Sequence, residues 1–512
     1  MFGFITRRIS VLLVILLGSS FLIYNLEALS GDPIEDLRLS KAPNAKHLIQ
    51  VFTHELQLDV PPPLRFFNWL KGVLGFFVGN FDLGLTRTHE HVGAMVGAAL
   101  PTTIRLVLGA TILAIILGIT VGIITALRQY SRFDYIMTFI AFLLFSLPVF
   151  WVAVLLKQYL AIGFNNFLAK PVVTLPWILG IALFGGLFWA GVLGGERRQV
   201  WLKFGIGALS SGFTIWLLGA LNWFVKPSLG PVMVLVLGIG IAFAITQISL
   251  GLSNRRGLYA ALGVAALGFV VYFPIQTVLT PNFNLGLLLG LAALTVLISG
   301  AIGYFFTKVD RSATIRTTVI TGVLIAGVIY VDKLMRTWHS YASTDAVNMR
   351  PVPTVGQSNS LLETHDYWFL TLDGLMHLFL PTMALMIISF AGYIRYARGS
   401  LLEVMNQDYI RTARAKGLSE RTLVMRHAFR NALIPLTTIM AFDFAGVVGG
   451  AIITERVFGW VGMGTLFNTA IGGQDLNLLM GVFFVTGSMA LLANLAADLI
   501  YSALDPRIRV GQ

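Results

Sequence analysis

The chain has 512 residues, of which 56% are hydrophobic and only 12% are charged. A typical soluble domain has roughly 25% charged residues, and a globular core has no room for this much apolar surface. These figures exclude the soluble, disordered, fibrous and disulfide-stapled classes, and the absence of cysteine excludes thiol and iron–sulfur chemistry. In a soluble protein the net charge of +12 would suggest a nucleic-acid partner. In a membrane protein an excess of basic residues first indicates which loops lie on the cytoplasmic side, so no nucleic-acid partner is expected.

Apolar segments long enough to cross a membrane recur along the whole chain. Each span needs roughly 20 apolar residues to cross about 30 Å of hydrocarbon, and hydropathy predicts about twelve of them. The first is a retained anchor, because no small-residue cleavage site follows it. Two long polar stretches, about 30–98 and 332–373, lie between spans. The predicted spans are 9–29, 102–127, 135–163, 177–194, 204–224, 231–250, 258–278, 285–306, 317–331, 375–396, 433–453 and 476–504.

The basic residues test this map, since each span moves the following loop to the other side of the membrane. With the N-terminus inside, about 22 of the 36 Lys and Arg residues fall in inside loops, and every alternate loop is basic. Those inside loops carry a net charge of about +15, whereas a random collection of basic residues in loops would not alternate. The sequence therefore predicts an all-α polytopic membrane protein with both termini in the cytoplasm.

The longest basic loop, 397–430, has a regular pattern of helix-forming and helix-ending residues, which a simple solvated loop would not require. It is too polar to span the membrane, and its pattern predicts a helix, a turn and a second helix. Gly417 is the expected stop signal of the first helix, and Ser419 is the expected N-cap of the second. The first helix, 409–418, is exposed and basic, so its displacement could tilt the flanking spans. A solvated positive-inside loop would explain the charge but not the helix–turn–helix order.

The sequence from Gln407 to Pro435 resembles the cytoplasmic EAA loop of binding-protein-dependent ABC importers, specifically that of the dipeptide/oligopeptide permease family. Arg411-Thr412-Ala413 stands where the general motif has Glu-Ala-Ala, as in the peptide-permease version of the motif, and Gly417 stands in the motif's glycine place. Short motifs extend the resemblance over about 1–165 and 365–510. They include Gly-Asp-Pro at 31–33, Gly-Asn-Phe-Asp-Leu-Gly at 79–84, Thr-Glu-Arg-Val-Phe at 454–458, Gly-Met-Gly at 462–464 and Asp-Pro-Arg-Ile-Arg at 505–509.

The resemblance implies that the loop 397–430 couples the chain to an ATPase subunit. Asp443 is an isolated carboxylate in its span and is a candidate for the translocation path, with pairing to a neighbouring subunit as the alternative. No catalytic residue, metal site or cofactor is expected on this chain. The residues assigned to the coupling loop are Glu403, Tyr409, Arg411, Thr412, Ala413, Arg414, Lys416, Gly417, His427, Arg430 and Asn431.

The resemblance also implies a set of partners in the cytoplasmic (inner) membrane of a prokaryote. They are a second homologous permease chain, two ATP-binding-cassette subunits carrying ATP and Mg²⁺, and an extracytoplasmic solute-binding protein. The phosphate-binding sequence G-x-x-x-x-G-K-[ST] does not occur here, because the dipeptide Gly-Lys is absent from the whole chain. ATP hydrolysis is therefore expected on separate subunits.

The resemblance stops between about 170 and 373, where about six additional spans are predicted. The expected organisation is a six-span type I ABC importer permease core, formed by 1–165 with its exterior loop 30–98 and by 336–512, interrupted by an inserted membrane region at 170–335. Because the number of inserted spans is even, both halves of the core keep the same orientation relative to the membrane. The insert is either a lipid-facing addition or a docking surface for another subunit or lipid.

Di- and oligopeptides are the expected substrates, while oligosaccharides, nickel complexes and opines stay open. A twelve-span secondary transporter without ATPase partners is the main alternative function. It predicts internal symmetry, but the segment 411–435 has no repeat in the first half of the chain. A membrane-embedded enzyme would need a His, Asp or Glu cluster at the span ends, which the sequence does not provide.

Overall fold

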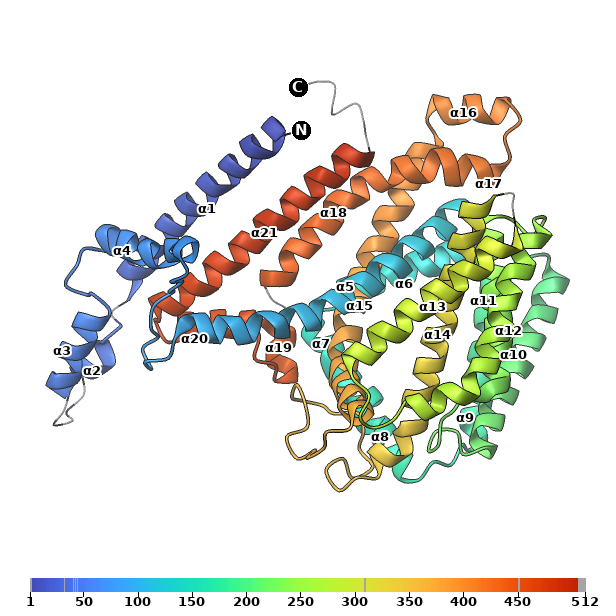
Figure 1. The fold of residues 1–512 in the computed structure, drawn as a ribbon, viewed down its shortest axis with the longest axis horizontal. Helices are drawn as coiled ribbons and strands as arrows, with labels where there is room; N and C mark the ends of the chain where they lie inside the picture. The colour runs from blue at the N-terminus through green and yellow to red at the C-terminus, as the bar shows by residue number, and fades with distance from the viewer. Residues whose placement is uncertain are drawn as a thin grey trace. The chain divides into compact units, whose positions relative to one another are not determined.

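The computed structural model describes residues 2–31, 33–39, 41, 43, 45–307, 310–449 and 452–504. Within these ranges every regular element is a helix, apart from one isolated β-bridge between Leu85 and His91 (Figure 1). The hydrocarbon core of a membrane offers no hydrogen-bond partners, and in a helix the backbone N–H and C=O groups pair with one another. The chain divides into two compact units. Unit 1 is Met1–Gln158, Gly191–Gly194 and Leu378–Gln512, and unit 2 is Tyr159–Ala190 and Gly195–His377.

Unit 1 contains the helices of both chain ends. Its first part is α1 (Phe2–Ser30), α2 (Glu35–Leu39), α3 (Ala45–Glu55), α4 (Pro62–Leu74), a 3-10 turn (Gly75–Val78), α5 (Val92–Leu127), α6 (Arg132–Ser146) and α7 (Val149–Leu156). Its second part is most of α15 (Tyr367–Met405), then α16 (Asp408–Ala415), α17 (Glu420–Thr422), a π-helical turn (Leu423–Ala428), α18 (Phe429–Gly449), α19 (Ile452–Phe458), α20 (Met463–Gly472) and α21 (Leu476–Leu504).

Unit 2 is built mainly from long apolar helices. A π-helical turn (Lys157–Gly163) leads into it from α7. Its helices are α8 (Phe164–Ala169), most of α9 (Leu175–Leu193), α10 (Arg197–Ala220), α11 (Gly230–Ser249), α12 (Arg255–Val278), α13 (Leu285–Phe306), α14 (Arg311–Ala342) and the start of α15.

The predicted spans correspond to observed helices, and the chain is a helical polytopic membrane protein. Among the described residues, eleven helices are long and apolar enough to cross a membrane. The remaining predicted span, 433–453, corresponds to α18, and its residues 450 and 451 lie outside the described ranges. The count of twelve stays a prediction. The motif at 505–509 also lies outside the described residues.

Several predicted spans have different boundaries in the structure: α5 begins ten residues before the predicted 102, and α15 extends beyond both ends of the predicted 375–396. Two further differences have a clear local cause or consequence. The span 135–163 breaks between α6 and α7, because Pro148 has no N–H to donate and holds Leu147 in an extended conformation with ψ of 131°. The span 317–331 is shorter than the helix that contains it, since α14 continues to Ala342. The polar stretch predicted from residue 332 therefore begins inside a helix.

In unit 1, helix ends that are distant in sequence meet. Arg8 in α1 forms an ion pair with Asp498 in α21, with Nε and Oδ2 2.5 Å apart, and the two helices run side by side (Figure 1). A separate apolar cluster joins Ala126 near the end of α5, Leu401 near the end of α15 and Ala432 near the start of α18. Each contact joins ends that the predicted topology assigns to the cytoplasm, so the packing agrees with the alternation read from the charges.

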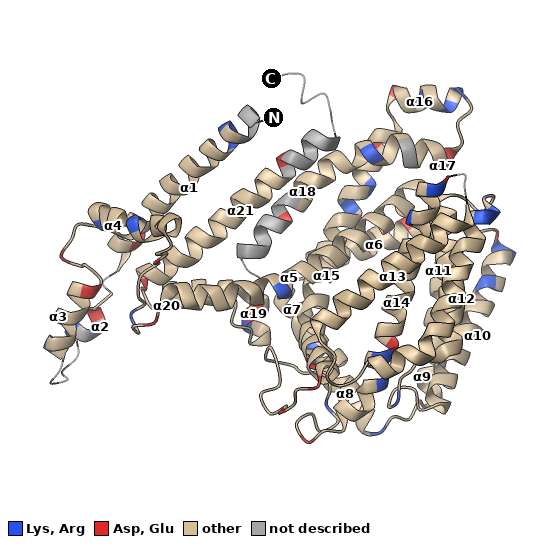
Figure 2. Ribbon diagram, in the orientation of Figure 1, with Lys and Arg blue, Asp and Glu red and all other residues tan. Residues whose placement is uncertain are grey.

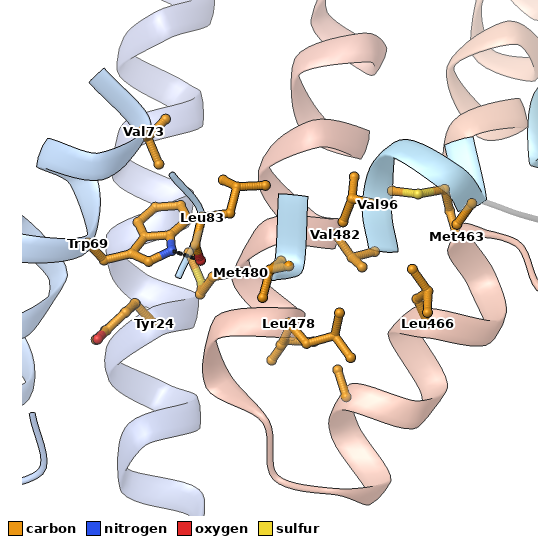
Figure 3. Packing of buried hydrophobic residues seen from close by; sticks show 14 of the residues in the cluster. Tyr24, Trp69, Val73, Leu83, Val96, Met463, Leu466, Leu478, Met480 and Val482 are labelled. Atoms are coloured by element: carbon orange, nitrogen blue, oxygen red, sulfur yellow. Dashed lines mark hydrogen bonds between the residues drawn. The ribbon is translucent and has the colours of Figure 1, made fainter. Parts of the chain in front are cut away.

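The polar stretch 30–98 includes a folded cap on the opposite ends of α1 and α21. Trp69 in α4 is buried against Tyr24 of α1, and its Nε1 donates a hydrogen bond to the carbonyl of Leu83 at 3.2 Å (Figure 3). Leu478 and Met480 of α21 belong to the same buried cluster. The cap gives this side of unit 1 an ordered surface.

One carboxylate fastens several elements of unit 2 to α14. Asp332 is fully buried and accepts hydrogen bonds from the backbone N–H groups of Leu229 at 2.7 Å and Gly230 at 3.0 Å. Its second oxygen accepts from the hydroxyl of Tyr272 in α12 at 2.7 Å. Gly230 has φ of +71°, a conformation that favours glycine, and this brings its N–H to the carboxylate.

We expect Asp332→Ala to destabilise unit 2 by about 3 kcal/mol, because three donors lose their acceptor in a buried place. The measurement is thermal unfolding of the purified chain in detergent. Asp345→Ala, at an exposed position of the same unit, is the matched control and should leave the melting temperature unchanged. Equal melting temperatures for the two variants would contradict this assignment.

Candidate functional site

The short helix α16 lies beyond the ends of α15 and α18 (Figure 1). Its inner side is apolar: Ile410 is fully buried and Ala413 is partly buried. Ile410 packs in one cluster with Ala126 of α5, Leu401 of α15 and residues of the following π-helical turn. A single side chain thus seats α16 on the ends of spans that come from both halves of unit 1.

The outer side of α16 is polar and exposed. Figure 2 shows an acidic residue at the start of the helix and basic residues toward its end, which is the favourable orientation for the helix dipole. Tyr409, Arg411 and Lys416 are exposed, and Arg411 lies 3.7 Å from Asp408 in an exposed ion pair. The hydroxyl of Thr412 donates to the carbonyl of its own helix at Asp408. This outer side is accessible to a partner.

Gly417 ends the helix as predicted. It has φ of +79°, and its N–H donates to the carbonyl of Arg414 at 3.0 Å, while that of Leu418 donates to Ala413 at 3.4 Å. These two bonds form a Schellman motif, in which glycine avoids the strain that a side chain would meet. Ser419 caps α17 by accepting from the N–H of Thr422. Gly417 and Ser419 are therefore confirmed as stop and cap, although the helix predicted over 409–418 ends at Ala415.

Two polar links brace the loop. The Nδ2 group of Asn431 donates to the hydroxyl of Tyr409 at 2.7 Å and to the carbonyl of His427 at 3.2 Å, which joins α16 to the start of α18. Arg414 forms a two-pronged ion pair with Glu420, with Nε–Oε1 at 2.8 Å and Nη2–Oε2 at 3.4 Å. The loop is therefore held as one body rather than as two independent helices.

The structure brings together only some of the residues assigned to this loop. Tyr409, His427 and Asn431 meet, whereas Glu403 is exposed in the last turn of α15 and Arg430 is exposed at the start of α18. Glu420 was missed by the sequence reasoning, although its pairing with Arg414 follows once Gly417 reverses the chain. The coupling role of these residues stays a prediction.

A partly buried ion pair connects α15, which leads into the loop, to the start of α6. Arg398 in α15 donates to Asp134 in α6, from Nε to Oδ1 at 2.7 Å and from Nη2 to Oδ2 at 2.9 Å. The backbone N–H of Tyr130 also donates to this carboxylate, at 3.0 Å. The hydrogen bonds from Arg398 hold the pKa of Asp134 below its ordinary value. The pair fixes the turn between α5 and α6 against α15.

Glu455, in the Thr-Glu-Arg-Val-Phe motif, forms a second buried carboxylate node. It is fully buried in α19 and accepts from the hydroxyl of Thr103 in α5 at 2.9 Å and from the N–H of Thr465 in α20 at 2.8 Å. A Cβ atom on Gly462 would collide with both the Glu455 carboxylate and the Thr103 hydroxyl. The first glycine of the Gly-Met-Gly motif therefore leaves room for this node. Neither role was visible in the sequence, because Thr103 lies 352 positions from Glu455.

Asp443 has a partner within the chain. It accepts a hydrogen bond at 2.6 Å from the hydroxyl of Tyr393, which joins α18 to α15. This contact gives one of the two carboxylate oxygens a donor within the chain, and pairing with a neighbouring subunit stays a prediction. A place for Asp443 on the translocation path stays a prediction.

The Asp134–Arg398 pair predicts a pH dependence of stability. Because the pKa of Asp134 is lowered in the folded chain, its stabilisation is present above the unfolded pKa of about 4 and is lost as the pH falls through the folded pKa. We expect Asp134→Asn to lower the melting temperature in detergent at pH 7 and the deficit to shrink below pH 4. Asp59→Asn, at an exposed position, is the control. A deficit that is constant with pH would contradict the expectation.

Comparison with known proteins finds a family whose members are similar to this loop and to the helices around it. Residues 347–510, which include α16 and the helices α17–α21, match the family described as binding-protein-dependent transport system inner membrane component. The chain is 25% identical over 510 residues to a protein of Mycobacterium tuberculosis (strain ATCC 25618 / H37Rv) named oligopeptide transport system permease protein OppB, and the match covers 99% of both chains.

Two further relatives match shorter segments at higher identity. The oligopeptide transport system permease protein AppB of Bacillus subtilis (strain 168) is 38% identical over 163 residues, which are 32% of this chain and 50% of that protein. The dipeptide transport system permease protein DppB of Escherichia coli (strain K12) is 39% identical over 138 residues, 27% of this chain and 41% of that protein. The match to the family, the full-length relative and the helical membrane architecture agree. The chain is thus similar, over residues 347–510, to the binding-protein-dependent transport system inner membrane components, and over its full length to an oligopeptide permease protein.

Proposed function

We propose that this chain is a permease subunit of an ATP-driven ABC importer for di- and oligopeptides, and that α16 is the helix on which an ATPase subunit acts. The observation that carries the proposal is the geometry of α16: a basic helix, exposed on its outer side, whose inner residue Ile410 is buried against the ends of the spans. The names of the similar proteins support the peptide class of substrate.

The contacts of α16 give it the means to transmit a displacement. Its outer residues Tyr409, Arg411 and Lys416 are available to acidic or carbonyl groups of a partner groove. Its inner side contacts the π-helical turn Leu423–Ala428 and belongs to the apolar cluster that includes the ends of α5 and α15, and Asn431 ties it to α18. A partner that moves α16 therefore moves three spans together, and closure of an ATPase dimer would switch the permease between inward-facing and outward-facing states.

The other partners follow from the same proposal. A second homologous permease chain completes the pore, and two ATP-binding-cassette subunits hold ATP and Mg²⁺. The ordered cap that contains Trp69 and Leu83 offers a folded surface to an extracytoplasmic solute-binding protein. The assembly would lie in the inner membrane of a prokaryote, with this chain as a multi-pass component.

The test of this proposal uses the positive φ of Gly417. Gly417→Pro forces φ near −65° and removes the N–H that donates to Arg414, so α16 loses the end that fixes its orientation. We expect the variant to insert in the membrane and to associate with its partners, but to lose at least tenfold of its ATP-dependent peptide uptake in proteoliposomes. ATP hydrolysis should continue without uptake.

Gly417→Ala and Gly399→Ala form a matched pair for the same assay. An added Cβ meets no heavy atom within 4 Å at either glycine, but only Gly417 has a positive φ. Gly417→Ala should therefore reduce uptake partly and Gly399→Ala should not. Normal uptake by Gly417→Pro would contradict the coupling role. Uptake by this chain alone, without ATPase subunits, would support the secondary-transporter alternative.

A further inference from the structure

Unit 2 contains an apolar cavity of about 330 Å³ between α12, α13 and α14, three helices that pack against one another (Figure 1). A water molecule needs only about 10–15 Å³ of such space, so the cavity is far larger than a packing defect. Its walls are aliphatic over most of their area. Representative lining residues are Val264 and Gly268 of α12, Leu291 and Ile298 of α13, and Ile325 and Gly327 of α14.

The cavity opens sideways between the helices. Leu294, Ile298 and Val323 line it and are also 50%, 40% and 46% exposed. All three helices are long and apolar enough to span a membrane, and α13 is the least buried of the candidate spans. In a bilayer the opening therefore faces hydrocarbon. Water is a poor occupant, because the lining offers few polar partners.

One end of the cavity carries aromatic and basic side chains. Tyr330 lines the cavity, and its hydroxyl lies 3.1 Å from that of Tyr367. The ring of Trp368 lies 5.2 Å from Tyr330 and 5.2 Å from Phe283, centroid to centroid. Lys333 places its Nζ 5.7 Å from the centroid of the Trp368 ring. Aromatic rings and cations at the end of a span are typical of the headgroup level of a membrane.

We propose that this cavity binds one acyl chain of a membrane phospholipid whose phosphate lies near Lys333. An empty apolar cavity loses the dispersion contacts of its whole lining, whereas a flexible hydrocarbon chain entering from the side restores them. The phosphate gains a cation at the end where the cavity becomes polar. The inserted region thus holds a lipid as part of its structure, independently of how the permease core is driven.

Two glycines in unit 2 provide a matched test. Gly327 lines the cavity and Gly290 does not, and a Cβ added to either meets no heavy atom within 4 Å. The full chain is purified in detergent, incubated with dioleoyl phosphatidylglycerol and analysed by native mass spectrometry. Wild type and Gly290→Phe should each retain one phospholipid, and Gly327→Phe should reduce the retained fraction at least tenfold.

Two more variants, one that fills the cavity from another helix and one that removes the cation expected near the phosphate, distinguish lost lipid binding from a folding defect. Ala292→Phe fills the cavity from α13 and should lose the lipid as Gly327→Phe does, with the elution volume on size exclusion unchanged. Lys333→Gln should weaken retention several-fold. Wild type without a retained phospholipid, or filled variants that keep it, would overturn the proposal. Occupancy by a helix of a second protein chain would appear as a protein mass in place of the lipid and would also overturn it.

Discussion

Buried carboxylates saturated with hydrogen bonds hold the helices of this chain together. In hydrocarbon there is no hydrophobic force between helices, so close packing and polar links must do this work. Asp134, Asp332 and Glu455 are each buried and each accept at least three hydrogen bonds, and for each at least one donor lies 60 or more positions away. An unpaired carboxylate in such a place would be strongly unfavourable, which explains why every oxygen has a donor.

These links decide how a movement of α16 would spread through unit 1. The helix α15 runs without interruption from the Asp134–Arg398 pair to the exposed end of the span near Met405. Ile410 then seats α16 on the cluster that includes the ends of α5 and α15. A continuous path of packed and hydrogen-bonded groups therefore connects the exposed basic surface of α16 to the three spans α5, α15 and α18.

The sequence predicted the local features of the site and missed the distant ones. Gly417 and Ser419 were recognised because a helix stop and an N-cap depend on adjacent residues. Arg398 and Asp134 lie 264 positions apart, and no local pattern announces such a pair. The break at Pro148 was hidden because a hydropathy average over 135–163 ignores which residue lacks an N–H. The cavity of unit 2 depends on which small residues face one another across three helices, which a single sequence does not show.

The central claim, that an ATPase subunit grips α16, is most directly tested by site-specific crosslinking. The chain has no cysteine, so Thr412→Cys is a single-cysteine variant without further substitutions, and Thr412 is exposed on the outer side of α16. Ser10→Cys, exposed in α1 near its predicted cytoplasmic end, is the control. With a photoactivatable maleimide and the assembled transporter, the account predicts a crosslink from Thr412→Cys to an ATPase subunit whose yield changes when ATP binds. An uptake-competent Thr412→Cys variant that crosslinks no more than Ser10→Cys would contradict it.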